Sequence, residues 1–486
     1  MNVFLIAILI LAALLAAAAV HALTLKAPVP GKRLACSRNE QELKEMGERF
    51  GRLIRIETPS CHDETPDLSS FERLQKEIDA LFPECRRQLD KTVLQGALIY
   101  HWKGRDAAAL PLLLMGHQDV VPADPEGWTH PPFEGAIADG KLWGRGTLDD
   151  KCNIFCQMQA IENLLSEGFI PECDVYLEYA VNEEISGHSA ERVADWFRER
   201  NIRFAAVWDE GGAVIDRAMA GMDRPYAVIG ICEKGYADLK ITARGSGGHS
   251  SAPKSATAVT RLADFIHEVN CHQPYRREFT PAVTSMFTNM APSFSFGMRL
   301  LLGNLWLFSP LLTVLLPKVS PQAGALLGTT CCFTMMKGSD ASNVIPSEAY
   351  VIANLRPGFT QGTEESIRIL KKYADRHDLE IEVLSSREAS PTTPVDTPVF
   401  RYLEKCVAER YPDCGCSPYV MLGGTDSRHF SSLSENILKF YPIRITSKQM
   451  GSMHNVDECI DLDACSDAVD FYQAFLRGYP GEQQRS

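Results

Sequence analysis

The sequence is short of basic residues and contains no basic stripe. Its 49 lysines and arginines are outnumbered by 62 aspartates and glutamates, which gives a formal net charge of −13. Because nucleic-acid binding depends on clustered positive charge, this composition argues against DNA or RNA as a partner. The 45% hydrophobic and 23% charged residues are typical of a globular protein. A length of 486 residues predicts at least two domains.

The chain also lacks a regular disulfide framework, because its 15 cysteines are odd in number and irregularly spaced. Cys152 and Cys156 lie four residues apart, and Cys414 and Cys416 lie two apart, which is weak evidence for a zinc–thiolate site. Most of the cysteines are expected to be small buried residues. Their abundance favours a reducing compartment.

Charged side chains are absent from residues 1–25, and residues 4–20 are almost wholly aliphatic or alanine. Such a segment is nearly long enough to cross a bilayer as a helix. A cleavable signal normally begins with a basic region, which is missing here, so we interpret the segment as an uncleaved membrane anchor, with secretion as the alternative. Lys26, Lys32 and Arg33 follow it and favour a cytoplasmic enzyme.

Three short apolar runs in the first half of the chain end in a histidine or in acidic residues. They are residues 109–116 before His117, residues 175–181 before Glu183 and Glu184, and residues 205–208 before Asp209. Such runs are typical of buried parallel strands. Because open α/β sheets bind ligands at the carboxyl ends of their strands, we expect these side chains at one edge of a sheet.

A glycine-rich turn places Asp149 and Asp150 before an expected helix over residues 151–166. An N-cap explains one aspartate but not the pair, and a carboxylate that bridges two cations is the stronger role for Asp149. Glu183 beside Glu184 fits a division of roles. Glu184 would ligate a metal, and Glu183 would take the proton of the metal-activated water.

Two histidines complete a set of metal-type side chains. His117 and Asp119 point to the same side of an extended segment, so Asp119 can accept a hydrogen bond from the imidazole and fix its tautomer. A distant histidine such as His454 is more often structural. Here it would give each of two zinc ions one histidine, one private carboxylate and a share of Asp149. The predicted ligands are His117, Asp149, Glu184, Asp209 and His454.

The periodicity predicts an α/β fold with an insertion. Strand–helix alternation up to about residue 232 indicates a mainly parallel sheet. The pattern then changes to a strand over 236–243, a helix over 257–269 and strands near 332–336 and 349–355, which is typical of an α+β lid. We expect a discontinuous catalytic domain over 37–232 and 358–480, which closes with a helix over 462–477. The lid or dimerisation domain is expected over 233–357.

Within the expected lid, residues 300–316 carry no charge. Gly303, Asn304 and Pro310 interrupt this run and argue against a straight membrane-spanning helix. Buried lid helices are one interpretation. The other is an apolar groove, or a membrane-contacting face, for a lipid-like acyl chain, and exposure of the segment would favour it.

The chain resembles the co-catalytic zinc carboxypeptidase/aminoacylase family over about residues 39–479. The segments that carry the resemblance are GHQDVVP, GRGTLDDK, NEE, DEGG, GGHSSAP, NVIPSE, NLRPG, GGTDSR and MHNVDE. DVVPADPEGWTHPPFEG, RGTLDDK and NLWLFSPLL resemble most closely the carboxypeptidase S and N-fatty-acyl-amino-acid synthase/hydrolase branch. The resemblance implies a zinc-exopeptidase-like catalytic domain with two Zn²⁺, and the branch suggests export.

The resemblance also implies residue roles. The five predicted ligands match the family's ligands, with Asp149 bridging, while Glu183 matches the general base and Asp119 the orienting partner of the histidine. His249 matches a histidine of the smaller domain that reaches a neighbouring subunit's site and stabilises the tetrahedral oxyanion. The positions that hold the substrate's free carboxylate or its carbonyl are matched by Asn343, Arg356, Gly424 and Thr425.

The expected function is zinc-dependent hydrolysis of the amide bond of N-acyl amino acids or small peptides with a free carboxylate. A carboxypeptidase that acts on dipeptides is the main enzyme alternative. A binding or receptor-like protein on an inactive hydrolase scaffold is the non-enzyme alternative, but such proteins usually lose a ligand or the base, and all six positions are intact here. Homodimerisation through the lid is also expected.

Overall fold

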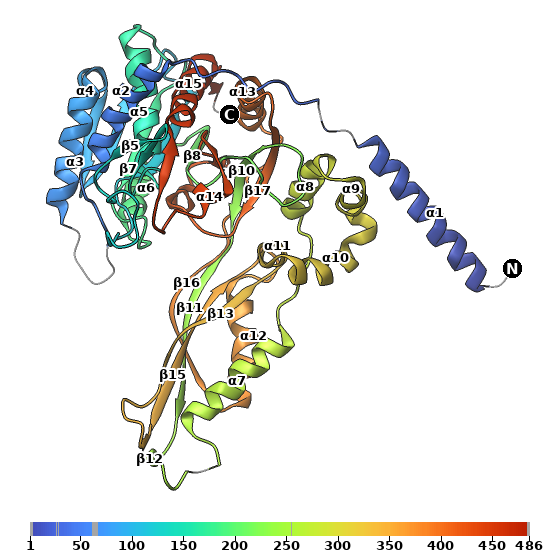
Figure 1. Cartoon of the computed structure of the whole chain (residues 1–486). Helices are drawn as coiled ribbons and strands as arrows, with labels where there is room; N and C mark the ends of the chain where they lie inside the picture. Colours follow the sequence, from blue (N-terminus) through green and yellow to red (C-terminus); the bar gives the residue numbers. More distant parts are fainter. Residues whose placement is uncertain (1–2, 26, 28, 61–66, 254, 484–486) are drawn as a thin grey trace.

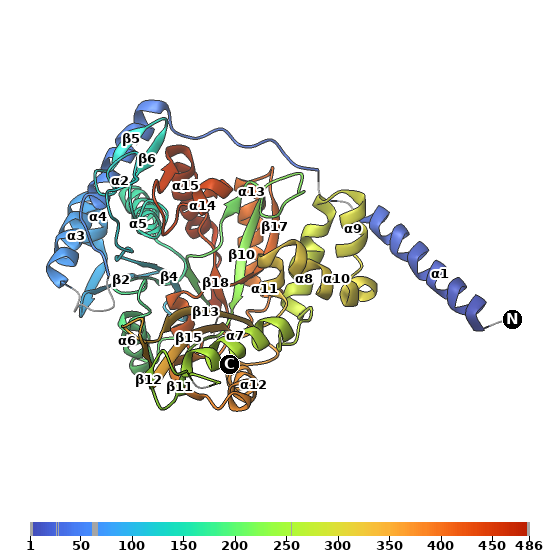
Figure 2. The ribbon, with the colours of Figure 1, turned by 60° about the horizontal axis from the view of Figure 1, so that its bottom comes forward.

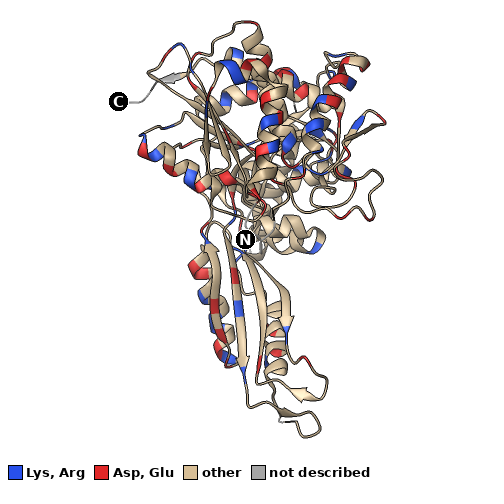
Figure 3. Ribbon diagram, turned by 90° about the vertical axis from the view of Figure 1, so that its left-hand side faces the viewer, with Lys and Arg blue, Asp and Glu red and all other residues tan. Residues whose placement is uncertain are grey.

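A computed structural model describes the chain except for residues 1–2, 26, 28, 61–66, 254 and 484–486. Lys26, one of the basic residues expected to set the membrane orientation, therefore lies outside the described part. Figure 1 shows a large domain, an elongated small domain below it, and helix α1 (Val3–Thr24), which projects from one side. In the described part of the chain, acidic and basic residues are interspersed over both domains (Figure 3).

The large domain is built on one ten-stranded sheet. Its strands are β1 (Asp90–Leu94), β2 (Ala97–Trp102), β4 (Leu112–His117), β7 (Val175–Ala180), β8 (Ala206–Asp209), β9 (Val214–Ile215), β10 (Tyr226–Glu233), β17 (Gly415–Met421), β18 (Ile437–Lys439) and β19 (Arg444–Ile445). The order is β1-β2-β7-β4-β8-β18-β10-β9-β19, with β17 beside β10. The central strands β7, β4, β8 and β18 run parallel, whereas β1, β2 and β7 pair antiparallel. The predicted α/β class is confirmed.

Helices cover both faces of this sheet because its strands are apolar on both sides. In β4, Leu112 and Leu114 join one core, and Leu113 and Met115 join the other. The first core is covered by α2 (Glu40–Ile54), α3 (Leu68–Leu81), α4 (Pro83–Gln88), α5 (Lys151–Ser166), α13 (Pro398–Arg410) and α15 (Leu462–Gly478). The second is covered by α6 (Ser189–Glu199) and the 3₁₀ helix η2 (Asp426–Phe430).

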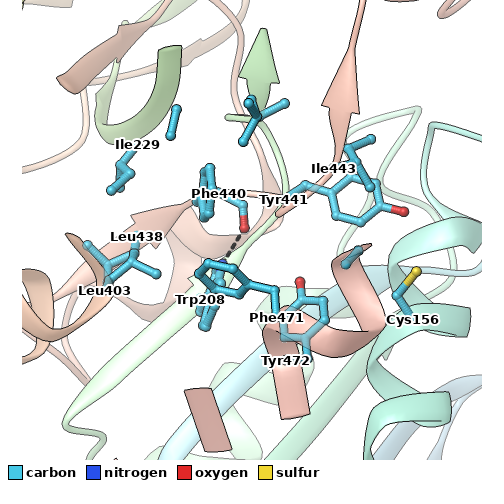
Figure 4. Packing of buried hydrophobic residues seen from close by; sticks show 14 of the residues in the cluster. Cys156, Trp208, Ile229, Leu403, Leu438, Phe440, Tyr441, Ile443, Phe471 and Tyr472 are labelled. Atoms are coloured by element: carbon cyan, nitrogen blue, oxygen red, sulfur yellow. Dashed lines mark hydrogen bonds between the residues drawn. The ribbon is translucent and has the colours of Figure 1, made fainter. Parts of the chain in front are cut away.

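Short elements complete the large domain. They are α14 (Ser447–Met450), a three-stranded sheet of β5 (Ala136–Ala138), β6 (Lys141–Trp143) and β20 (Cys459–Asp461), and the pair β3 (Ala109–Leu110) and β21 (Glu482–Gln483). Aromatic packing fixes the end of β8 (Figure 4). Trp208 packs against Tyr472 and Phe475 of α15, with ring centroids 5.1 and 4.8 Å away, and its indole N–H donates to the carbonyl of Phe440. The acidic residues that follow Trp208 are thereby held at the sheet edge.

The small domain is a four-stranded antiparallel sheet with two helices. Its strands lie in the order β13 (Thr330–Lys337), β15 (Glu348–Arg356), β11 (Tyr236–Arg244) and β16 (Glu380–Arg387). The helices α7 (Ala258–His272) and α12 (Thr363–Arg376) pack on it. The hairpin-like pair β12 (Gly248–His249) and β14 (Val344–Ile345) forms its far tip. The sheet extends past residue 357, where we expected the lid to end, because a strand's sequence does not reveal which sheet it joins.

The segment 281–327 also departs from the expected domain boundary. It folds into α8 (Pro281–Met290), the 3₁₀ helix η1 (Ala291–Ser293), α9 (Phe296–Leu302), α10 (Leu305–Val319) and α11 (Pro321–Leu326). Apolar residues of these helices, such as Val283, Phe287 and Leu312, belong to the large-domain core and not to that of the small domain. As the interrupting residues predicted, the apolar run is not straight, and α9 and α10 meet at 102°.

Candidate active site

The predicted metal-type residues lie at the carboxyl edge of the parallel strands. His117 ends β4, Glu183 and Glu184 follow β7, and Asp209 ends β8. Loops bring the remaining two to the same place: Asp149 lies just before α5, and His454 lies between α14 and β20. The described residues thus confirm that the edge of the sheet collects side chains distant in sequence.

The carboxylate of Asp149 lies between two imidazoles. Its Oδ1 is 3.0 Å from Nε2 of His117, and its Oδ2 is 3.1 Å from Nε2 of His454. The same nitrogen of His454 is 3.0 Å from Oε2 of Glu184. Each oxygen of one carboxylate therefore faces a different histidine, which is the arrangement that a bridging ligand requires.

Asp209, a predicted ligand, lies outside this constellation. Its carboxylate accepts hydrogen bonds from the backbone N–H of Glu210, at 2.9 Å, and of Ser427, at 2.8 Å. The side chain of Glu210 instead lies with those of His117 and Glu183, with ligand atoms within 4.8 Å of one another. Successive residues of an extended segment point to opposite sides, so the side chains of Asp209 and Glu210 have different neighbours. The sequence feature that could have pointed to Glu210 is its place as the second acidic residue of the DEGG segment.

Asp119 orients its surroundings more broadly than predicted. Nδ1 of His117 lies 3.0 Å from the backbone carbonyl of Asp119 and 3.4 Å from its Oδ1. The two carboxylate oxygens also accept the backbone N–H groups of Glu183 and Glu184, both at 3.2 Å. One fully buried aspartate thus positions the histidine and both glutamates.

Burial and the proximity of several carboxyl groups shift the pKa values of the residues at this centre. Burial raises the pKa of Glu183 and of Glu210 well above the usual range, and neighbouring carboxylates add to this effect. Burial also acts to raise the pKa of Asp149, but hydrogen bonds from His117 and His454 outweigh it and lower the pKa. Hydrogen bonds to Asp149 and Glu184 raise the pKa of His454 to about 10.

The residues present fit divalent cations. Imidazole nitrogens and carboxylate oxygens are the donors that zinc accepts at catalytic sites. Two groups of such atoms, His117–Asp149–Glu184 and His117–Glu183–Glu210, are each confined within 4.8 Å. Oε1 of Glu184 is buried without a hydrogen-bond partner among the described residues, so an acceptor is left over for an ion.

Sequence reasoning missed the pair that ties the Asp149 loop to the His454 loop. Glu458 is fully buried and pairs with the guanidinium of Arg145. Its Oε1 also accepts the backbone N–H groups of Gly146, at 3.1 Å, and Leu148, at 2.7 Å. Four residues after His454, Glu458 therefore sets the distance between the two loops that carry metal-type side chains.

Of the predicted substrate-binding and oxyanion residues, His249 and Asn343 lie at the tip of the small domain. His249 is exposed, and its Nδ1 lies 2.8 Å from Oγ of Ser251. Ser250 donates its backbone N–H to the carbonyl of Asn343 at 3.1 Å, so His249 and Asn343 lie on two loops that pair with each other. Figure 1 places β12 at the end of the small domain farthest from the large domain, which contains β7 and β8. Within one chain they are not brought together.

Arg356, Gly424 and Thr425 lie at the junction between the domains. Thr425 donates its hydroxyl to Oε1 of Glu233 at 3.0 Å. Arg356 lies over the ring of Tyr236, at 4.7 Å.

A second arginine, Arg387, lies over the same ring at 5.3 Å and was not predicted. A Cβ on Gly424 would lie 2.2 Å from its Nη2, so glycine is needed there for the close approach. Arg387 and Arg428 both line a cavity of about 270 Å³. No alternation or motif in the sequence marked Arg387, because it ends a strand in an unremarkable SSRE segment.

Known proteins match this chain along most of its length. Residues 113–478 match the peptidase family M20/M25/M40. N-fatty-acyl-amino acid synthase/hydrolase PM20D1 of Xenopus tropicalis is 33% identical over 438 residues, which cover 89% of this chain and 85% of the relative. Probable carboxypeptidase S-like 2 of Dictyostelium discoideum is 31% identical over 445 residues, with the same coverage of 89% and 85%.

Solved structures share the fold. The M20 family metallo-carboxypeptidase Sso-CP2 of Sulfolobus solfataricus superimposes with a TM-score of 0.67 at 17% identity, over 90% of this chain and 99% of that one. The resemblance inferred from the motifs, including its branch, is confirmed. The chain belongs to peptidase family M20/M25/M40 and is a hydrolase of the metallopeptidase and amidohydrolase class.

Proposed function

We propose that this enzyme hydrolyses the amide bond of N-acyl amino acids or small peptides that carry a free carboxylate, at a centre of two Zn²⁺. The observation that carries the proposal is the Asp149 carboxylate between His117 and His454, with Glu183 at the same edge. The relatives named for N-fatty-acyl-amino acids and for carboxypeptidase S support the two substrate classes.

The ligands divide into two sets around Asp149. Glu184 and His454 would hold one ion, and His117 and Glu210 the other, with Asp149 shared. Bound zinc lowers the pKa of a water molecule and polarises a carbonyl oxygen. Glu210 replaces Asp209 in this set, and Asp209 anchors the loop that carries Thr425 and Ser427.

Glu183 is the proposed proton carrier. It accepts a proton as the water oxygen bonds to the amide carbon, and it delivers that proton to the amine nitrogen as the C–N bond breaks. Its raised pKa and its buried position suit a group that must be protonated midway through the reaction. Arg428, with Nη1 4.0 Å from Oε1 of Glu183, orients the carboxylate without a close ion pair.

The substrate carboxylate would bind at the domain junction. Arg356 and Arg387 offer guanidinium groups beside Gly424 and Thr425, and a guanidinium binds a carboxylate through two parallel hydrogen bonds. Arg387 pairs with no carboxylate within 4.0 Å among the described residues, so its charge is available to a ligand.

His249 and Asn343 would act on the centre of a second copy. Both are exposed at the tip of the small domain, far from the metal-type residues of their own chain. A homodimer joined through the small domains would bring each tip to the partner's centre, where His249 could stabilise the oxyanion. This arrangement is the proposed reason for the elongated insertion.

Helix α1 is the proposed membrane anchor, with secretion after cleavage as the alternative. It is the one helix of the described chain that is long and apolar enough to span a bilayer by itself. Of its described residues, Ala18 and Ala22 are buried, and nearly all the others are exposed.

The test compares a long-chain N-acyl amino acid with a blocked dipeptide, before and after chelation and zinc restoration. Zinc-dependent release of the amino acid from either substrate supports the proposal, and the faster substrate assigns the class. Undiminished hydrolysis after complete metal removal would contradict the metal-dependent mechanism. Failure to hydrolyse either substrate with full zinc content would favour the inactive binding protein.

A further inference from the structure

We propose that α10, together with the bend that joins it to α9, is a second membrane-contact surface resting on the bilayer that α1 enters. Both Figure 1 and Figure 2 place α9 and α10 on the side of the body from which α1 projects. The bound partner is a phospholipid bilayer, and the proposal concerns attachment, not the hydrolysis proposed above.

Helix α1 is docked on the bend between α9 and α10. Asn304, at this bend, is fully buried and donates its side-chain amide to the backbone carbonyl of Ala18 at 3.0 Å. Its Oδ1 lies 2.9 Å from Nδ1 of His21. A buried amide without hydrogen-bond partners lowers stability, and Asn304 finds partners in α1. Asn304 therefore forms a docking site for the C-terminal half of α1.

Gly303, the residue before Asn304, also belongs to this docking site. A Cβ on Gly303 would lie 2.4 Å from Cδ1 of Leu25, so the small residue permits the close approach of the chain that follows α1. Arg299 donates to the carbonyl of Leu25 at 3.3 Å. Removal of residues 1–25 would strip these partners away, which favours retention of the helix over cleavage.

The outer face of α10 is mainly apolar and exposed. Leu305, Leu312 and Leu316 are buried against the large-domain core. The opposite face presents Trp306, Leu311, Val314 and Leu315, which are 60%, 49%, 54% and 41% exposed, and the exposed Lys318 follows them in the last turn. Residues 300–316 carry no charge. A contiguous apolar face of this kind marks a contact with another apolar phase.

The length and composition of α1 point to lipid as that apolar phase. The 22 residues of α1 extend about 33 Å at 1.5 Å per residue, which matches a hydrocarbon core of about 30 Å. The exposed face of α10 is continuous with this helix through the Asn304 docking site. Trp306 donates its indole N–H to Asn304 at 3.1 Å while its ring remains exposed, as expected for an aromatic residue at a membrane interface.

The experiment uses the full chain reconstituted in phosphatidylcholine vesicles with brominated acyl chains, which quench nearby tryptophans. Quenching relative to unbrominated vesicles should fall in Trp306→Phe and should not fall in Trp196→Phe, since Trp196 is on α6 at the far side of the large domain. In a second variant, Leu311→Glu with Leu315→Glu, the quenching of Trp306 should also fall while the chain still floats with the vesicles.

Equal quenching in the wild type and Trp306→Phe would overturn the proposal, as would a chain that does not float with vesicles. The same holds if Trp306 becomes shielded from iodide in detergent as the protein concentration rises, because a second copy of the chain would then cover the face. Amide hydrolysis in detergent is measured in parallel. If the protein does not hydrolyse the amide although Trp306 is quenched, only the proposed function is contradicted. If it hydrolyses the amide but Trp306 is not quenched, only the proposed membrane-contact surface is contradicted.

Discussion

The metal-type centre of the large domain and the tip of the small domain differ in how much of their chemistry one chain supplies. At the centre, carboxylates and imidazoles from five separate segments meet. Contacts of 3.0 to 3.1 Å link Asp149 to His117 and His454 and link His454 to Glu184, and the ligand atoms of Glu183 and Glu210 lie within 4.8 Å of that of His117. At the tip, His249 has Ser251 of its own loop as partner and is otherwise open to solvent. Under the proposed function, one chain would supply the nucleophile and its base, whereas His249 could stabilise the oxyanion only from a second copy.

The largest effect should come from Glu183→Gln. The amide cannot carry the proton from water to the leaving amine, so kcat should fall by about 10²- to 10⁴-fold while the metal remains bound. Steady-state kinetics and elemental analysis of the same sample check this. Glu191→Gln, which changes a half-buried acid on α6, is the matched control. Activity within twofold of the wild type in Glu183→Gln would remove Glu183 from the mechanism.

His249→Ala tests the other half of the comparison. Loss of one oxyanion donor should lower kcat by about 10²- to 10³-fold. Mixed with Glu183→Gln subunits, it should regain activity, because a mixed dimer holds one centre with an intact base and an intact partner histidine. Absence of rescue after verified subunit exchange would mean that the tip acts on no second copy.

Glu210→Gln and Asp209→Asn separate the ligand from the loop anchor. Glu210→Gln should weaken zinc binding by at least about 10- to 100-fold and leave a substoichiometric metal content. Asp209→Asn should keep both ions, because its carboxylate contacts backbone N–H groups of Glu210 and Ser427. Zinc titration of the metal-free variants decides between them, and the reverse pattern would restore Asp209 as the ligand.

Arg387→Gln should raise KM by about tenfold, which corresponds to about 1.4 kcal/mol of lost carboxylate binding, with little change in kcat. The same substrate with its carboxylate converted to a carboxamide should show no difference between variant and wild type. Arg356→Gln is the parallel variant of the other guanidinium that lies over the Tyr236 ring. Equal KM effects on the carboxylate and the carboxamide would show that Arg387 is structural.

The smallest effect concerns Asp467, which lies in α15, away from both regions. Burial raises the pKa of this carboxyl from 3.8 to about 6, and Arg410 offsets only part of the shift. The folded state then binds the proton more tightly than the unfolded chain, so this group lowers stability as pH rises from about 4 to about 6. Asp467→Asn should remove this part of the slope in denaturation midpoints. An unchanged slope would contradict the raised pKa.

The sequence predicted which side chains gather at the carboxyl edge of the sheet, because apolar runs mark buried parallel strands and the ends of such strands lie at one edge. It placed α5 at Lys151–Ser166, as found. It did not foresee that the carboxylate of Asp209 would accept two backbone N–H groups while Glu210 lies beside His117, because the apolar run does not reveal on which residue the strand turns. It also could not foresee that Glu458 would hold the Asp149 loop, or that Arg387 would reach Gly424. These contacts depend on tertiary packing between segments far apart in the chain.

The measurement that tests the central claim most directly is the zinc stoichiometry of the metal-free chain during titration, followed alongside amide hydrolysis. The account predicts that activity appears only as zinc binds and reaches its maximum at two ions per chain. Full hydrolytic activity in the metal-free chain, or saturation at one ion per chain, would contradict the two-metal centre around Asp149.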